Sequence, residues 1–149
     1  MKLVIQRVSS ASVSIEGKEI SSIKSGLLVL VGVADTDSMQ DLDSVVRKCV
    51  NLRIFNDNNG VMNRSIIDVC GDVLAVSQFT LLASTRKGNR PSYIHAAGHE
   101  IAIPMYNTFC DKVSELTGRP VMKGVFGADM QVSLVNDGPV TIVIDSSEV

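Results

Sequence analysis

Residues 26–33 (GLLVLVGV) constrain the fold most, because every position is apolar or glycine. An uninterrupted run of this kind is typical of a β-strand that is buried on both faces. A second apolar run, residues 73–76, ends at the polar Ser77 and also predicts a core strand. The two runs place a sheet at the centre of the fold.

Shorter β-like segments lie at both ends of the chain. Residues 2–15 alternate in part, and a turn at residues 16–18 followed by a return over residues 19–23 predicts a hairpin. Near the C-terminus we expect three further strands, over residues 121–125, 131–135 and 140–144. The last two are joined through Asn136-Asp137-Gly138-Pro139.

Two stretches have the spacing of amphipathic helices. The first is expected to begin at Asp37, with Gln40 completing a capping-box pattern, and to end near residue 52 or 53. The second covers about residues 100–117 and stops at Gly118. Its predicted core stripe is Met105, Phe109, Val113 and Leu116.

These elements predict one domain over residues 1–149 of the α+β class. Its sheet is expected to be largely antiparallel, curved and barrel-like, with two main helices. Strands and helices alternate too irregularly for a doubly wound fold.

Composition narrows the possible partners. The net charge is −2 and aromatic residues make up 4%, so the whole surface is not that of a general nucleic-acid binder. Residues 1–7 turn polar too early for a signal peptide, and no run approaches the roughly 20 apolar residues of a membrane span. We therefore expect a cytoplasmic protein without membrane contact.

Metal and thiol chemistry have little support. Three cysteines without CxxC spacing predict reduced thiols, and the oxygen-rich residues 56–60 predict a tight turn because they lack EF-hand spacing. A thiol hydrolase would have to pair Cys110 or Cys70 with His95 or His99. Both cysteines are better explained as small buried residues, and neither a metal nor another cofactor is indicated.

Polar chemistry gathers at residues 77–80, where Ser77, Gln78 and Thr80 supply two hydroxyls and a carboxamide. If the strand persists, Gln78 and Thr80 share one face, but a plain strand end would look the same. Gly138-Pro139 is similarly ambiguous, since it can be an ordinary turn or a cis peptide.

A long irregular stretch, residues 83–98, carries Arg86, Lys87 and Arg90. Three cations so close together could grip phosphate, with Gly88 allowing close approach. Composition alone favours a solvated surface loop.

Two motifs resemble those of a known family. Ser77-Gln78-Phe79-Thr80-Leu81 and Asn136-Asp137-Gly138-Pro139-Val140-Thr141 are similar to the signatures of the D-aminoacyl-tRNA deacylases. Four supporting blocks extend the resemblance over nearly the whole chain: Gln6-Arg7-Val8, Gly26-Leu27-Leu28, Leu52-Arg53-Ile54-Phe55 and Lys87-Gly88-Asn89-Arg90-Pro91-Ser92.

The resemblance implies an enzyme that hydrolyses the ester between a D-amino acid and the 3′-terminal adenosine of tRNA, and also clears mischarged glycyl-tRNA. It implies a homodimer whose active sites lie at the subunit interface. Gly138-Pro139 would be cis and would enter the partner's pocket, where its carbonyls exclude an L side chain. Cofactors are not implied.

The same resemblance assigns roles to individual residues. Gln78, Phe79 and Thr80 would form the catalytic segment, chiefly through backbone amides, while the ribose 2′-hydroxyl assists. Thr80 as a nucleophile is the other possibility, although no adjacent base is evident. Ser77, Asn136, Gly138 and Pro139 would bind the substrate, and Arg86, Lys87 and Arg90 would contact tRNA.

A second class of function stays open from the sequence. The same scaffold could serve as a non-catalytic module that binds tRNA or protein, to which the acidic composition gives modest support, but the intact motifs count against it because a binder needs no esterase pocket.

Overall fold

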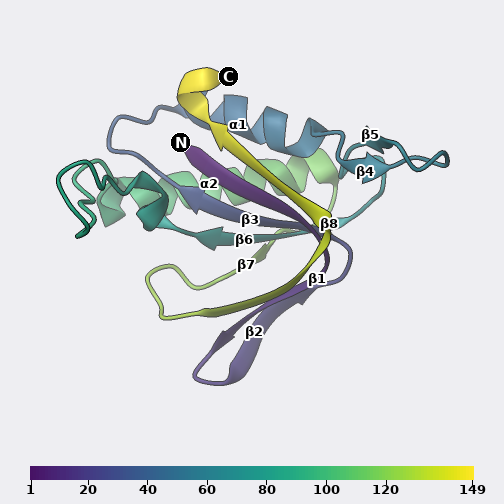
Figure 1. The fold of residues 1–149 in the computed structure, drawn as a ribbon, viewed down its shortest axis with the longest axis horizontal. Coiled ribbons are helices and arrows are strands. Elements are labelled where there is room, and N and C mark those ends of the chain that lie inside the picture. The colour runs from purple at the N-terminus through teal and green to yellow at the C-terminus, as the bar shows by residue number, and fades with distance from the viewer.

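The computed structural model describes residues 1–149 and has the expected α+β fold, with a curved, nearly closed sheet and two α-helices (Figure 1). The elements are, in chain order, β1 (Lys2–Ile15), β2 (Lys18–Ile23), β3 (Gly26–Gly32), α1 (Met39–Asn51), β4 (Phe55–Asn56), β5 (Met62–Arg64), β6 (Asp72–Ser77), the 3₁₀ helix η1 (Phe79–Leu82), α2 (His99–Thr117), β7 (Met122–Lys123), β8 (Gln131–Asp145) and the 3₁₀ helix η2 (Ser146–Glu148).

The sheet has the order β2-β1-β3-β6-β7, and β8 pairs with the other edge of β1. The pairs of β1 with β2, β3 and β8 are antiparallel, as the hairpin pattern predicted. The pairs β3–β6 and β6–β7 are parallel, so the sheet is mixed at this end. A parallel pair needs a long crossover, and the chain between β3 and β6 supplies it with α1 and the β4–β5 hairpin.

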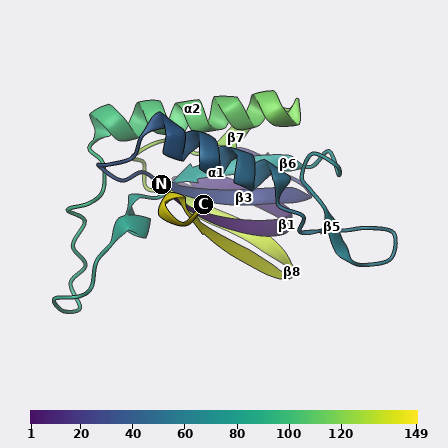
Figure 2. The same cartoon turned by 90° about the horizontal axis from the view of Figure 1, so that it is seen from above.

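Both faces of β3 are covered, which explains its unbroken apolar sequence. Leu27, Val29 and Val31 belong to the large core between the sheet and the two helices, which lie side by side over one face (Figure 2). Leu28 points to the other face and joins a smaller core with Val8 and residues of β2 and β6. Neither helix has the length and apolar character needed to cross a membrane.

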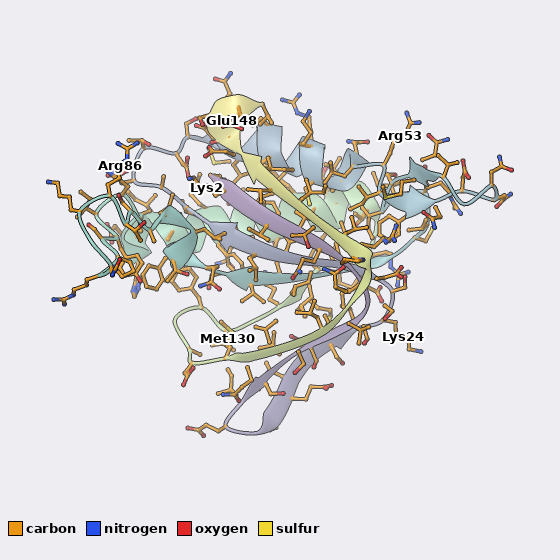
Figure 3. The ribbon with its side chains drawn as sticks, in the orientation of Figure 1. Lys2, Lys24, Arg53, Arg86, Met130 and Glu148 are labelled. Carbon is orange, nitrogen blue, oxygen red and sulfur yellow. The ribbon has the colours of Figure 1, made fainter.

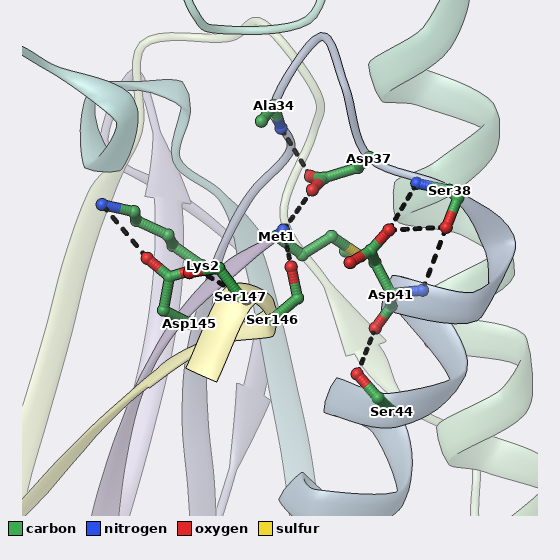
Figure 4. A network of polar contacts seen from close by, with 10 residues as sticks. All are labelled: Met1, Lys2, Ala34, Asp37, Ser38, Asp41, Ser44, Asp145, Ser146 and Ser147. Atoms are coloured by element: carbon green, nitrogen blue, oxygen red, sulfur yellow. Dashed lines mark hydrogen bonds and ion pairs between the residues drawn. The ribbon is translucent and has the colours of Figure 1, made fainter. Parts of the chain in front are cut away.

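The start of α1 differs from the prediction. Ser38, not Asp37, is the N-cap, and it forms a reciprocal capping box with Asp41 (Figure 4). Hydrogen bonds from Ser38 lower the pKa of the Asp41 carboxyl. Asp37 instead pairs with the amino group of Met1 and accepts from the Ala34 N–H, because β1 brings a positive charge to this point.

Two predicted strand boundaries and one predicted core position also change. Residues 131–135 and 140–144 are not separate strands but parts of β8, whose pairing with β1 is interrupted in the middle. The strand predicted over residues 121–125 is reduced to the short β7. On α2, Leu116 is exposed, and Tyr106 takes a core position that the predicted stripe omitted.

Phe109 is the side chain that most directly tests this packing. It is fully buried on α2, so Phe109→Ala should lower the free energy of unfolding by about 3–5 kcal/mol. Leu116→Ala on the same helix is the matched control and should cost far less, since Leu116 is 47% exposed. Urea denaturation at one protein concentration measures both, and equal losses would contradict the assigned packing.

Candidate functional site

A cavity of about 630 Å³ opens where β6 and β3 end, beneath the first turns of α2. Its lining is mostly apolar, with a few polar groups, as is usual for a small-molecule site. The residues that line it are Val31, Val33, Val76, Ser77, Gln78, Phe79, Ala97, Gly98, His99, Ala102, Tyr106, Phe126, Gly127, Ala128, Asp129, Met130 and Val132.

Residues 77–79 form one edge of this cavity, but not as a continued strand, and Thr80 does not line it. The ladder ends at Ser77, and the Gln78 N–H still donates to the Val31 carbonyl at 2.7 Å. The chain then turns into η1, so the alternating faces expected for these residues do not occur. Phe79 and Thr80 occupy the first two positions of η1, where N–H groups have no acceptor within the helix.

The side chains of this segment are engaged with neighbours. Gln78 Nε2 donates to Thr80 Oγ1 at 2.5 Å. Phe79 is 55% exposed and packs edge-to-face on Tyr93, with ring centroids 5.0 Å apart. No Asp, Glu, His or Lys side chain hydrogen-bonds to Thr80, so its hydroxyl has no base in place to activate it.

Gly138-Pro139 lies where β8 leaves the ladder. Pairing passes from Gln6–Thr141 to Val8–Asn136, so residues 137–140 of β8 stand opposite Arg7 alone. This bulge is held internally by Asn136, whose Oδ1 accepts from the Val140 N–H at 2.8 Å. The peptide between Gly138 and Pro139 is cis, and both residues are exposed.

Arg7 holds the bulge in place through Asp137. In the sequence, nothing about this arginine alone indicated that structural role. Its guanidinium is nearly buried, donating from Nε to the Asp137 carbonyl at 3.0 Å and from Nη1 to the Ile54 carbonyl at 2.5 Å. It also lies 3.3 Å from the Asp137 carboxylate. The available signal was a charged residue between Ile5 and Val8, in a strand that is otherwise apolar on that side.

The two motifs do not meet within one chain. Gln78 lies beside Val31 at the end of β3, whereas Arg7 pairs with Leu27 near its start. Four residues of strand correspond to about 13 Å. None of residues 136–141 lines the cavity, and Figure 1 shows the end of β6 and the bend of β8 at opposite ends of the sheet.

The basic loop is next to the cavity. Arg86, Lys87 and Arg90 are exposed and form no ion pair, and Figure 3 shows Arg86 at the end of the molecule where β6 stops. Backbone hydrogen bonds of 2.9 Å in both directions between Ser84 and Ser92 close the loop at its base. The loop contacts the cavity edge through Tyr93, whose ring packs on Phe79, while none of the three cations lines the cavity.

The structure opposes the thiol-hydrolase alternative. Burial raises the pKa of the Cys110 thiol to about 11, and His99 lies 11 residues away on the same helix, a rise of about 16 Å. Cys70 is exposed, not buried as expected, and its thiol contacts only the Ile67 carbonyl. No group of three or more His, Cys, Asp or Glu side chains is arranged to hold a metal, and residues 56–60 form the expected turn.

Sequence reasoning missed the far wall of the cavity. Tyr106 is buried there, donates from its hydroxyl to the Ala75 carbonyl at 2.8 Å, and has a pKa raised by burial. Phe126 packs edge-to-face on both His99 and Tyr106. These residues have no motif of their own, and only the fold brings α2 and residues 124–130 to the end of β6.

Comparisons with known proteins agree over almost the full length. The family model described as D-Tyr-tRNA(Tyr) deacylase matches residues 4–145. Curated proteins named D-aminoacyl-tRNA deacylase from Parabacteroides distasonis and Porphyromonas gingivalis are 58% and 59% identical over 146 residues, covering 98% of this chain and 97% of theirs.

Two solved structures share the fold. One, titled c-Myc DNA Unwinding Element Binding Protein, has a TM-score of 0.92 and 42% identity, covering 97% of this chain and 98% of its own. The other, titled as a probable eukaryotic D-amino acid tRNA deacylase, has a TM-score of 0.80 at 18% identity, covering 96% and 97%, and shows the fold alone. From the family model and the identity to its relatives, the chain belongs to the D-Tyr-tRNA(Tyr) deacylase family.

Proposed function

We propose that the protein hydrolyses the ester bond of D-aminoacyl-tRNA in the cytoplasm, releasing the free D-amino acid and tRNA. The observation that carries this proposal is the cavity edged by residues 77–79, in a chain that matches the deacylase family over residues 4–145. The cavity is the expected size for a terminal aminoacyl-nucleoside rather than for a whole nucleic acid.

Catalysis is proposed to depend on main-chain donors. The N–H groups of Phe79 and Thr80 are free at the start of η1, where they can stabilise the ester carbonyl as it becomes an oxyanion. Gln78 holds the Thr80 hydroxyl, so Thr80 positions the ester rather than attacking it. The neighbouring ribose 2′-hydroxyl of the substrate assists the hydrolysis.

Chiral selection is proposed to come from a second subunit in a homodimer. The Gly138-Pro139 bulge is exposed and far from the cavity of its own chain, so it is available to enter the partner's cavity. Val135 and Val143 on the same strand are 57% and 68% exposed and offer apolar surface for the contact. The carbonyls of Gly138 and Pro139 would clash with an L side chain but admit a D residue or glycine.

The other contacts follow from position. Ser77 and Asn136 are proposed to complete the substrate-binding groups, one at the cavity edge and one inside the bulge. Arg86, Lys87 and Arg90 are proposed to bind phosphates of the acceptor end, since their loop contacts Phe79 through Tyr93 and no acidic side chain pairs with them.

A non-catalytic binding module is the competing function. The solved structure at 42% identity is titled as a DNA-element binding protein, which favours nucleic-acid binding on this scaffold. Turnover separates the two functions, because a binding module retains aminoacyl-tRNA without releasing the amino acid.

The primary test compares D-Tyr-tRNA with L-Tyr-tRNA and glycyl-tRNA. We expect hydrolysis of the D ester and the glycyl ester, with the L ester slower on the order of 100-fold or more, because only its side chain meets the carbonyls of the bulge. Release of labelled amino acid gives the rates. Binding of tRNA without turnover, or equal rates for the D and L esters, would refute the proposed activity.

Thr80→Ala tests the role of that hydroxyl. A positioning residue should leave kcat within about tenfold of the parent enzyme, whereas removing a nucleophile typically costs a factor of about 10⁴ or more. Thr85→Ala in the exposed part of the basic loop is the matched control. A loss of the larger size in Thr80→Ala alone would make Thr80 the nucleophile.

Gly138→Ala tests the chiral gate. Gly138 has φ +136°, and a Cβ there would lie 2.8 Å from Val140 Cγ2 and 3.1 Å from Arg7 Nη2, so the bulge must shift. We expect the ratio of D to L hydrolysis to fall at least about tenfold. Gly60→Ala, also at positive φ but with open space around it, controls for backbone strain. Unchanged discrimination in a stably folded variant would place the gate elsewhere.

A further inference from the structure

A second cationic surface lies along α1 and is separate from the basic loop. A groove of about 470 Å³ runs along the end of α1, and we name it the α1 groove. It is lined by Ser44, Arg47, Lys48, Asn51, Leu52, Arg53 and Val149. Three of these side chains are cations and none is an aspartate or glutamate, so the lining has an excess of positive charge even with the α-carboxylate of Val149 beside it.

The cations of the α1 groove are not neutralised within the fold, although Arg47 and Arg53 donate from Nε to the main-chain carbonyls of Asp43 and Asn63. All three are exposed and none forms an ion pair, whereas Lys2, Arg7, Lys112, Arg119 and Lys123 each pair with an aspartate. The helix dipole accounts for Lys48 in the last turn of α1. It does not account for Arg53, which lies beyond the end of the helix and is oriented by the Asn63 carbonyl.

The α1 groove is tied to the Gly138-Pro139 bulge. Arg53 directly precedes Ile54, whose carbonyl accepts from Arg7, and Arg7 in turn holds the Asp137 carbonyl. This short path fixes the Arg53 end of the groove relative to the bulge. Figure 3 shows Arg53 at the opposite end of the molecule from Arg86.

We propose that the α1 groove binds the phosphate backbone of the tRNA whose aminoacyl end occupies the partner subunit's cavity. The inference rests on the proposed function, in which the bulge of one subunit enters the cavity of its partner. The α1 groove of the subunit that supplies the bulge would then lie next to the partner's cavity. Guanidinium groups suit phosphate oxygens, and the groove shares no lining residue with its own chain's cavity. Each bound tRNA is then held by the basic loop of one subunit and the α1 groove of the other.

The first test is the triple variant Arg47→Gln, Lys48→Gln and Arg53→Gln in the full-length protein. Its KM for D-Tyr-tRNA should rise at least about tenfold, and the slope of log KM against log salt should fall by up to about one for each phosphate that the variant no longer binds. The rate on D-tyrosyl-adenosine, which lacks the acceptor stem, should change by less than about twofold, because that substrate carries no phosphate for the groove to hold. Neutralising Arg86, Lys87 and Arg90 should have the same pattern of effects.

The controls separate the possible failures. Lys18→Gln, which removes an exposed cation at the start of β2, should leave KM and the salt slope unchanged. An unchanged KM in the triple variant, or an equal loss on D-tyrosyl-adenosine, overturns the α1-groove proposal while leaving the deacylase intact. Failure of the parent protein to hydrolyse either substrate overturns the proposed function instead.

A mixed dimer tests whether the groove acts across the interface. One subunit carries the triple substitution and an intact cavity. The other carries intact cations and Ser77→Trp, which fills the cavity and must be inactive as a homodimer. We expect the mixed dimer to have the same KM as the parent enzyme, because the tRNA in the working cavity is bound by the intact groove of the other subunit. If the mixed dimer instead has the raised KM of the triple variant, the groove does not act on the partner's substrate.

Discussion

The buried guanidinium of Arg7 joins parts of the chain that would otherwise be independent. It binds the carbonyl of Asp137 in β8 and the carbonyl of Ile54 after α1, while its own backbone pairs with β3. A charge that is 7% exposed is costly unless its donors are satisfied, so the bulge and the segment after α1 must both take their observed positions. One interaction thus sets the shape of the bulge and its relation to the α1 groove.

The double-sided burial of β3 imposes the second constraint. Because both faces are covered, functional groups can reach solvent only at the ends of the central strands. The cavity lies at the end of the sheet where β6 stops at Ser77, and the bulge lies towards the opposite end. A site that needs both motifs therefore needs two copies of the chain, and this separation is the physical basis for the proposed dimer.

The sequence predicted those parts of the fold that depend on local pattern. The apolar run of residues 26–33, the hairpin of residues 2–23 and both helices were confirmed because periodicity and turn residues determine them. The predicted helix cap was wrong, because Asp37 forms an ion pair with the amino group of Met1, which is far away in the sequence. Arg7 and Tyr106 were missed for the same reason, because each owes its role to a carbonyl on another element. The continuity of β8 was also hidden, as the turn-like residues 136–139 form a bulge within one strand.

Selection by exclusion suits the groups that the cavity edge contains. Gln78 and Thr80 are hydrogen-bonded to each other, and neither side chain can carry a charge near neutral pH. Main-chain donors recognise an ester whatever amino acid it carries, so they cannot select one side chain over another. In the proposed reaction, discrimination must then come from a rigid obstacle close to the α-carbon. A glycine can bring its backbone closer than any other residue, and Arg7 supplies the rigidity that makes such an obstacle effective.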